Sequence, residues 1–235
     1  MPNDYFTFKQ FTIRQDMCAF KVGTDGVLLG AYADVTGAKR ILDIGSGTGL
    51  VAIMLAQRSP AEIVAIEPDV ESFHQLVNNI EDCKWKDRIQ AVNDSVQNYD
   101  PGFSFGLIVS NPPYFINSIR NPDNRKSGAR HNDTLPHDEL LASVTRMLEE
   151  NGRFQVIMPF AEGNVLVAEA AAYGLHCNEI LKIKPLPSSE VRRLVLTFSR
   201  QKMRVSEKFL TIEHGSRHEF TEAYRALISD FYLKF

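Results

Sequence analysis

The stretch RILDIGSGTGLVAIMLA, residues 40–56, decides the fold class of this chain. Arg40 and the short apolar pair Ile41–Leu42 lead into the glycine-rich segment Asp43–Gly49, and the apolar run Leu50–Ala56 follows. A short apolar run, then glycines, then a longer apolar run is the pattern of a strand, a tight turn and a helix. Glycines allow positive φ angles and let a ligand approach the backbone closely. The stretch therefore predicts a strand–turn–helix unit of an α/β fold, with a ligand near the turn.

A regular alternation of apolar segments surrounds this unit. We expect strands at 40–44, 62–66, 88–92, 106–110 and 153–158, and helices at 26–33, 50–58, 70–82, 137–149 and 162–173. Two more apolar runs, near 176–183 and 191–198, predict an antiparallel hairpin at the edge of the sheet. Strands that alternate with helices form parallel sheets with right-handed crossovers. We therefore predict an α/β, Rossmann-like fold, with a mostly parallel seven-stranded sheet, an antiparallel edge hairpin and helices on both faces.

Length and composition fit one domain. The chain has 235 residues, 44% of them hydrophobic, and no linker or repeat divides it, so we expect a single domain over 1–235. Within it we expect an N-terminal cap at 1–35, a core that carries the chemistry at 36–200, and a C-terminal extension at 201–235.

Several classes of protein are disfavoured. No apolar run is long enough to span a bilayer, and Met1–Asp4 lacks the basic and apolar regions of a signal peptide. The three cysteines, Cys18, Cys83 and Cys177, have no metal-ligand spacing and form no even disulfide set. A net charge of −3 argues against nonspecific coating of nucleic acid but is compatible with a local basic face. We expect a cytoplasmic, monomeric protein that has no contact with membranes and holds no metal.

A second informative stretch is Asn111–Tyr114, with the sequence NPPY. It follows the apolar run Leu107–Val109 and Ser110, so it should lie just past the carboxyl end of a buried strand. Prolines fix φ and donate no hydrogen bond, and the residue before a proline is pushed out of the helical region. Asn111 is thus held extended, with the flat face of Tyr114 beside it. This arrangement suits a planar group that carries an amino group, although an ordinary turn can have the same sequence.

The glycine-rich turn and the strands after it narrow the expected ligand. A phosphate-binding P-loop would need Gly-Lys-Ser/Thr, which is absent. Glu67 follows the next strand, where a carboxylate can accept both hydroxyls of a ribose in nicotinamide dinucleotides or in S-adenosylmethionine. Two features favour the latter. Asp43 can face a cationic amino acid moiety, and Asp94, after the third strand, can accept from an adenine amino group.

The order of these motifs resembles that of S-adenosylmethionine-dependent amino-methyltransferases. Over nearly its full length, the chain also resembles the bacterial tRNA-valine adenine-N6 methyltransferase family. The segments that carry this second resemblance are 20–31, 43–49, 111–114, Ala129–Arg130 with His137, Lys184–Pro187 and Asp230–Phe235. The resemblance implies an enzyme that uses S-adenosyl-L-methionine to methylate N6 of an unpaired adenine in the anticodon loop of a tRNA. At the catalytic positions the chain keeps the family's pattern.

We predict three sets of site residues. The catalytic residues are Asn111, Pro112, Pro113 and Tyr114. The cofactor-binding residues are Lys21, Thr24, Asp25, Asp43, Gly45, Gly47, Gly49, Glu67, Asp94, Ser95 and Asn111. The RNA-binding residues are Tyr114, Arg120, Arg125, Lys126 and Arg130. For Asp25, a helix cap is the competing role.

The expected chemistry is orientation rather than acid–base catalysis. The Asn111 side-chain oxygen and the Pro112 carbonyl can each accept one amino proton, which aims the nitrogen lone pair at the methyl group. A side-chain amide can be held in the same way, so N5-glutamine methylation of a protein is the alternative activity. A noncatalytic module that only keeps the cofactor is an alternative of a different class.

Two basic segments are candidates for RNA contact. Residues 117–131 contain four basic residues against Asp123 and directly follow the NPPY turn, which favours phosphate contacts over a solvated loop. Residues 200–208 contain Arg200, Lys202, Arg204 and Lys208 against Glu207, and there a solvated connection is the favoured interpretation. Neither segment matches an established RNA-binding motif.

Overall fold

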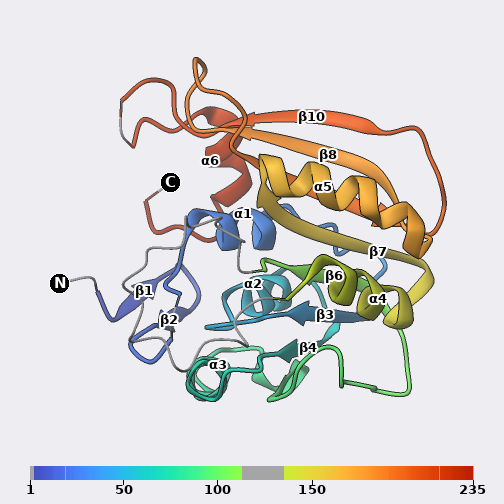
Figure 1. Ribbon diagram of the computed structural model, residues 1–235. Coiled ribbons are helices and arrows are strands. Elements are labelled where there is room, and N and C mark those ends of the chain that lie inside the picture. The colour runs from blue at the N-terminus through green and yellow to red at the C-terminus, as the bar shows by residue number, and fades with distance from the viewer. Residues whose placement is uncertain (1–2, 19, 113–134, 217, 235) are drawn as a thin grey trace, which may run out of the picture.

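An eight-stranded sheet, with the strand order β10-β8-β9-β7-β6-β3-β4-β5, organises the fold (Figure 1). The structure is a computed structural model that describes residues 3–234 except 19, 113–134 and 217. The strands of the sheet are β3 (Arg40–Ile44), β4 (Glu62–Ile66), β5 (Ile89–Val92), β6 (Phe105–Ser110), β7 (Leu148–Pro159), β8 (His176–Lys184), β9 (Arg193–Ser199) and β10 (Ser206–Thr211). A separate antiparallel pair is formed by β1 (Tyr5–Thr7) and β2 (Thr12–Arg14).

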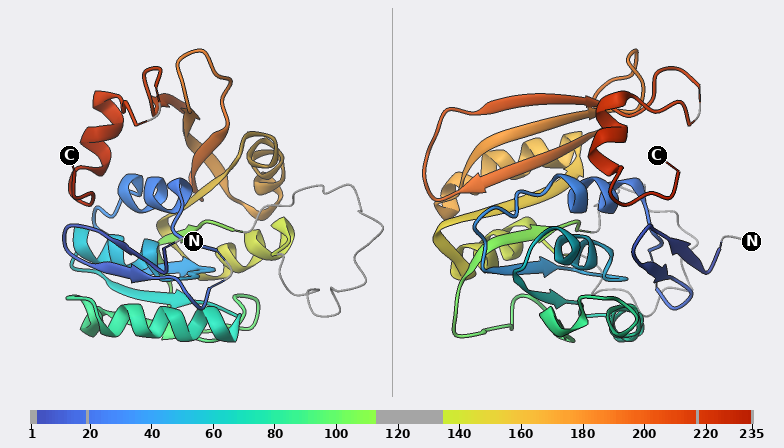
Figure 2. Two further views of the ribbon diagram at one scale, coloured as in Figure 1. Left: turned by 90° about the vertical axis from the view of Figure 1, so that its left-hand side faces the viewer. Right: turned by 180° about the vertical axis from the view of Figure 1, so that it is seen from behind.

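Helices cover both faces of this sheet. They are α1 (Thr24–Tyr32), α2 (Leu50–Arg58), α3 (Val70–Glu81), α4 (His137–Met147), α5 (Phe160–Ala170) and α6 (Glu222–Ile228), with 3-10 turns at Lys86–Arg88 and Ala171–Tyr173. One buried cluster joins apolar residues of α1, α2, α3 and α6 to one face, and a second joins α4 and α5 to the other (Figure 2). Because strand residues alternate between faces, Ile41 packs in the first cluster and Leu42 in the second.

The predicted α/β fold class is confirmed, but two details of the sheet differ. The sheet has eight strands rather than seven, and the β8–β9 hairpin does not lie at the edge, because β10 pairs parallel with β8. Sequence reasoning missed β10 because its residues are mostly polar. Its partner strand stabilises it through two cross-strand ion pairs, Lys182–Glu207 at 2.7 Å and Lys208–Glu179 at 2.6 Å.

The predicted solvated connection at 200–208 is therefore only partly correct. The Arg200 guanidinium donates to the backbone carbonyls of Thr145 and Leu148, and Ser206 begins β10. Arg200 thus ties the segment to the end of α4, and Lys208 is paired within the sheet. Lys202 and Arg204 remain exposed on the connection.

The strand order reverses between β3 and β6. From β3 the chain moves outward through β4 and β5, then returns to the other side of β3 as β6. In open α/β sheets, ligands bind at the carboxyl ends of the strands where the order reverses in this way. Gly45 directly follows β3 and Asn111 directly follows β6, so both predicted motifs lie where the order reverses.

The N-terminal and C-terminal segments pack against each other and against the helices on one face of the sheet. The backbone N–H of Lys9 donates to the carbonyl of Phe231 at 2.7 Å, and α6 contacts α1. Phe8 and Phe231 are both buried in the same cluster as α2. The single domain over 1–235 and its subdivision at 35 and 200 stay predictions.

Candidate functional site

The glycine-rich turn has the backbone geometry that a close ligand needs. Gly45, Gly47 and Gly49 all have positive φ angles. A Cβ atom added to Gly45 or Gly47 would meet nothing within 4 Å, so these two glycines face open space. At Gly49 a Cβ would lie 2.6 Å from Leu76 Cδ1, so this glycine permits close packing against α3. The predicted cofactor contact therefore has room at Gly45 and Gly47, whereas Gly49 faces the protein.

Asp43 is buried directly beneath this turn. Its side chain is 1% exposed, and among the described residues its Oδ2 atom has no hydrogen-bond partner. Burial raises the pKa of Asp43 to about 7, although hydrogen bonds from the Ser46 side chain and the Ala52 backbone N–H lower it in part. The nearby Glu67 carboxylate raises it further. An unpaired acceptor of this kind is suited to a cationic ligand group.

The raised pKa of Asp43 predicts how its removal changes stability with pH. The ordinary value, which applies to the unfolded chain, is 3.8, and the folded value is about 7. As pH rises through this range, Asp43 ionises in the unfolded chain before it ionises in the folded protein. The free energy of unfolding of the unsubstituted protein therefore falls as pH rises. We expect the free energy of unfolding of Asp43→Asn, relative to the unsubstituted protein, to increase between pH 4 and pH 7. Urea unfolding at several pH values measures this, and a difference independent of pH would contradict the assignment.

Glu67, which follows β4, connects the glycine-rich turn to the next helix. Its Oε2 accepts from the backbone N–H of Gly47 at 2.8 Å, and its Oε1 accepts from that of Asp69 at 3.0 Å. Burial raises the pKa of Glu67, and these two hydrogen bonds oppose the increase. Each carboxylate oxygen can accept a second hydrogen bond. The structure thus brings Glu67 beside Gly47, where it retains acceptor capacity for a ribose.

The segment that follows β5 lies next to Glu67 and includes Asn93, which sequence reasoning missed. Asp94 and Ser95 are half-buried, and Asp94 Oδ1 accepts from the Ser95 backbone N–H at 2.7 Å. Asn93 Nδ2 donates to the carbonyl of Glu67 at 2.9 Å and so couples the two strand tips. The only sequence signal for Asn93 is its position directly after β5.

Asn111 and Pro112 directly follow β6, as predicted, and two further residues fix their position. Ser110 is fully buried, and its Oγ donates to the carbonyl of Ile44 at 3.0 Å, which ties the tip of β6 to that of β3. A Cβ added at Gly26 would lie 3.9 Å from Asn111 Nδ2, so the start of α1 reaches Asn111. Asn111 is half-buried there and Pro112 is buried.

Three predicted cofactor-binding residues, Lys21, Thr24 and Asp25, lie at or just before the start of α1. Lys21 Nζ donates to the carbonyl of Asn3 at 3.2 Å and lies 3.9 Å from Asp4 Oδ1, so its contacts are with the N-terminal segment. Thr24 is exposed and begins α1.

Asp25 is not the helix cap, because the N-cap residue is Gly23 and no side chain caps it. Instead, Asp25 Oδ2 accepts from Arg193 Nε of β9 at 2.7 Å. This ion pair joins the start of α1 to the start of β9.

Three buried amides that sequence reasoning missed hold the N-terminal segment beside this site. Asn79 donates to the carbonyl of Thr48 at 2.9 Å and also bonds the backbone of Arg14. Gln75 accepts from the backbone N–H of Met17 at 2.9 Å, and Gln15 accepts from that of Val22 at 2.8 Å. A polar residue on the buried face of an amphipathic helix is the only signal for Gln75 and Asn79.

The remaining predicted residues lie outside the described part of the chain. They are Pro113, Tyr114, Arg120, Arg125, Lys126 and Arg130. Within the described residues, no group of three His, Cys, Asp or Glu side chains is placed to hold a metal ion. No helix there has both the length and the apolar character needed to cross a bilayer.

Comparison with known proteins gives consistent matches. The family model of the methyltransferase small domain matches residues 22–162. A tRNA1(Val) (adenine(37)-N6)-methyltransferase of Bacteroides thetaiotaomicron is 44% identical, and the match covers 99% of each chain. The enzyme of the same name from Trichodesmium erythraeum is 42% identical over 100% of each chain.

Two solved structures share the fold at low sequence identity. A predicted O-methyltransferase from Agrobacterium tumefaciens has a TM-score of 0.63 and 21% identity, and covers 88% of this chain and 96% of its own. The glycopeptide N-methyltransferase MtfA complexed with S-adenosyl-L-methionine has a TM-score of 0.55 and 14% identity, and covers 77% of this chain and 100% of its own. At these identities the likeness concerns the fold alone.

Proposed function

Because the chain belongs to the methyltransferase small domain family and to the family of tRNA1(Val) (adenine(37)-N6)-methyltransferases, we propose that it methylates N6 of adenine 37 in tRNA1(Val). The methyl donor is S-adenosyl-L-methionine. The main support for the proposal is that three motifs lie together at the carboxyl ends of neighbouring strands. The open glycines follow β3, Glu67 follows the neighbouring strand β4, and Asn111 follows β6 on the other side.

The residues at this edge fit the proposed cofactor. Gly45 and Gly47 leave open space above the turn, and Asp43 Oδ2 lacks a partner among the described residues. We assign the ribose hydroxyls to Glu67 and the adenine amino group of the cofactor to Asp94. When bound, S-adenosylmethionine supplies a methyl group that its sulfonium already activates for in-line attack.

The chain's own contribution is to position the acceptor amine. The Asn111 side-chain oxygen and the Pro112 carbonyl each accept one proton of the adenine amino group, which aims the nitrogen lone pair. Ser110 and Gly26 support this role by fixing the strand tip and bringing α1 against it. Tyr114, by its position in the sequence, stacks on the base. We assign no general base, because the proton can leave to solvent after transfer.

An unpaired base is the acceptor that such a turn can reach. A base inside a helix is stacked and paired, whereas loop bases can be splayed out into a pocket. An anticodon loop meets this requirement. We further propose that the protein acts in the cytoplasm, where its tRNA substrate is found, and that it acts as a monomer.

Mass spectrometry of nucleosides from treated tRNA tests the proposal. We expect N6-methyladenosine in tRNA1(Val) and none when adenine 37 is replaced by guanine. The two alternatives give different results in the same assay with labelled cofactor. Label in the glutamine of a protein extract, with tRNA inert, would assign the N5-glutamine activity. Cofactor binding without any transfer would assign a noncatalytic module.

The basic segment after the catalytic turn predicts a change in the salt dependence of RNA binding. We expect the combined replacement of Arg120, Arg125, Lys126 and Arg130 by alanine to raise the RNA dissociation constant. The slope of log affinity against log salt concentration should also become less negative by up to about 3, since each single-strand phosphate contact contributes roughly 0.7 to that slope. Filter binding at several salt concentrations measures this slope.

A matched control is available on the connection before β10. Lys202→Ala with Arg204→Ala removes two exposed cations from the other basic segment, and we expect an unchanged slope. Cofactor affinity should stay constant in both variants. An unchanged slope in the fourfold variant would assign residues 117–131 to a solvated loop.

A further inference from the structure

One half of the sheet extends well beyond the level of the catalytic turn. Ser110, the last residue of β6, pairs with Val156, but β7 continues to Pro159, which pairs with Arg193 of β9. Three further residues at about 3.3 Å each carry β7 roughly 10 Å past the end of β6. The end of β7 and the start of β9 therefore form a wall on the side of Asn111 away from the glycine-rich turn.

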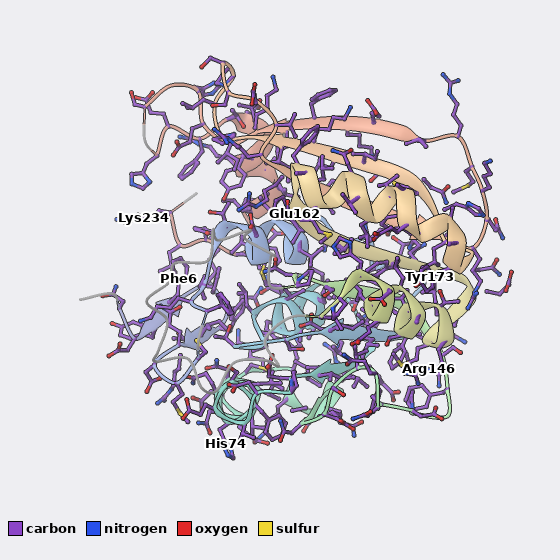
Figure 3. All side chains as sticks on the ribbon, in the orientation of Figure 1. Phe6, His74, Arg146, Glu162, Tyr173 and Lys234 are labelled. Atoms are coloured by element: carbon purple, nitrogen blue, oxygen red, sulfur yellow. The ribbon has the colours of Figure 1, made fainter. Side chains whose placement is uncertain are left out.

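Phe160 and Arg192 are joined through their backbones at the top of this wall. Phe160, the first residue of α5, is 43% exposed. Its backbone N–H donates to the carbonyl of Arg192 at 3.1 Å, and Arg192 is exposed. Figure 3 labels Glu162, two residues along α5, and so shows where this end of the helix lies.

The wall is tied to the start of α1, which approaches Asn111. Arg193, next to Arg192, is fixed by its 2.7 Å hydrogen bond to Asp25 at the start of α1. The same helix start approaches Asn111 at Gly26. The position of Arg192 and Phe160 relative to the acceptor site is thus set through β9 and α1.

The chemistry of this surface suits an unpaired base more than a phosphate cluster. The cations Lys184, Arg192 and Arg193 are accompanied by the acids Asp25, Glu162 and Glu190. With the charges balanced, net electrostatic attraction is weak. Exposed aromatic rings and arginine side chains are the groups on which single-stranded bases stack.

We propose that Phe160, with Arg192 beside it, stacks on a nucleotide that flanks the target adenine. This inference rests on the proposed function, because it takes adenine 37 as the base held at Asn111. The target base would lie at the level of the β6 tip, and its neighbour in the loop would rest on the top of the wall. Phe160 would then hold the splayed conformation of the loop.

The test uses an anticodon stem-loop RNA with the fluorescent base 2-aminopurine at one or the other neighbour of adenine 37. We expect binding to quench the fluorescence at one of these positions. In Phe160→Ala the quenching should disappear, and KM for the RNA should rise about 5- to 150-fold, the range for one stacked base. The value of kcat at saturating RNA should stay within a few fold, and Phe160→Tyr should restore quenching and KM.

Phe209→Ala is the matched control. Phe209 is 65% exposed and has Lys182 Nζ 5.5 Å from its ring centroid, but it lies on the edge strand β10, four strands from β6. We expect this variant to behave like the unsubstituted protein. If Phe160→Ala leaves quenching at both positions and KM unchanged, the inference is overturned. It is also overturned if the variant changes the sedimentation of the free protein, because Phe160 would then contact a second copy.

The test of base stacking on Phe160 and the test of the proposed methylation can fail independently. Nucleoside analysis with the unsubstituted protein decides whether adenine 37 is methylated. The quenching signal measures base stacking on Phe160 whether or not a methyl group is transferred. A protein that methylates adenine 37 normally with alanine at 160 retains the proposed function and loses this inference.

Discussion

Replacing Asn111 by alanine is expected to lower kcat for methyl transfer by about 100-fold or more, the usual loss when one oriented polar group is removed from a transition state. The side-chain oxygen of Asn111 accepts an amino proton most strongly when the acceptor nitrogen becomes tetrahedral, so its loss affects turnover more than binding. Ser110 still ties the strand tip to the carbonyl of Ile44, which keeps the turn in place. Single-turnover rates, together with dissociation constants for RNA and cofactor, measure the two effects separately.

Two further substitutions act as comparisons for Asn111→Ala. Tyr114→Phe should be mild and Tyr114→Ala severe, because the ring face rather than the hydroxyl is needed for stacking, which is worth about 1–3 kcal/mol per base. A weakening of cofactor binding equal to the loss of rate in Asn111→Ala would contradict an orienting role. It would place Asn111 in the cofactor site instead.

Replacing Glu67 by alanine is expected to weaken S-adenosylmethionine binding by roughly 2–4 kcal/mol, the value of two hydrogen bonds to a charged acceptor. The loss has two sources, because Glu67 also accepts from the backbone N–H of Gly47 at 2.8 Å and so shapes the turn. Titration calorimetry measures the affinity, and thermal unfolding checks that the variant is folded. Unchanged affinity in a folded variant would exclude the ribose role, and tight binding of a nicotinamide dinucleotide would favour the competing ligand.

Gly47→Val tests the same site through the backbone. The φ angle of Gly47 is +54°, and a Cβ there would project into open space where the cofactor is expected. Valine should therefore both strain the turn and obstruct the ligand.

Gly102→Val provides the control for strain alone. Gly102 has a φ angle of +71° and equally open surroundings, but it lies before β6, at the opposite end of that strand from Asn111. We expect both valine variants to lose stability, and only Gly47→Val to lose cofactor affinity. Equal affinities in the two variants would argue against a cofactor above Gly47.

Much of the fold could be predicted because it is specified locally. The predicted strands 40–44 and 62–66 coincide with β3 and β4, and helix α2 begins and ends at the predicted residues. Apolar runs of these lengths, bounded by glycines or polar residues, specify an element without reference to distant contacts. The edge strand β10 could not be found in this way, since it is defined by its pairing with β8, which lies more than 20 residues earlier in the chain.

The sequence by itself determined the α/β class, the three motifs and the chemistry they suit, because each motif is a short pattern whose backbone demands are local. Only the tertiary structure decided which residues support them. Asp25 pairs with Arg193, 168 positions away, and Ser110 reaches the carbonyl of Ile44 across 66. Asn79 likewise joins α3 to the glycine-rich turn and to β2. Such contacts depend on how separate strands and helices are brought side by side, and no local pattern of residues encodes that arrangement.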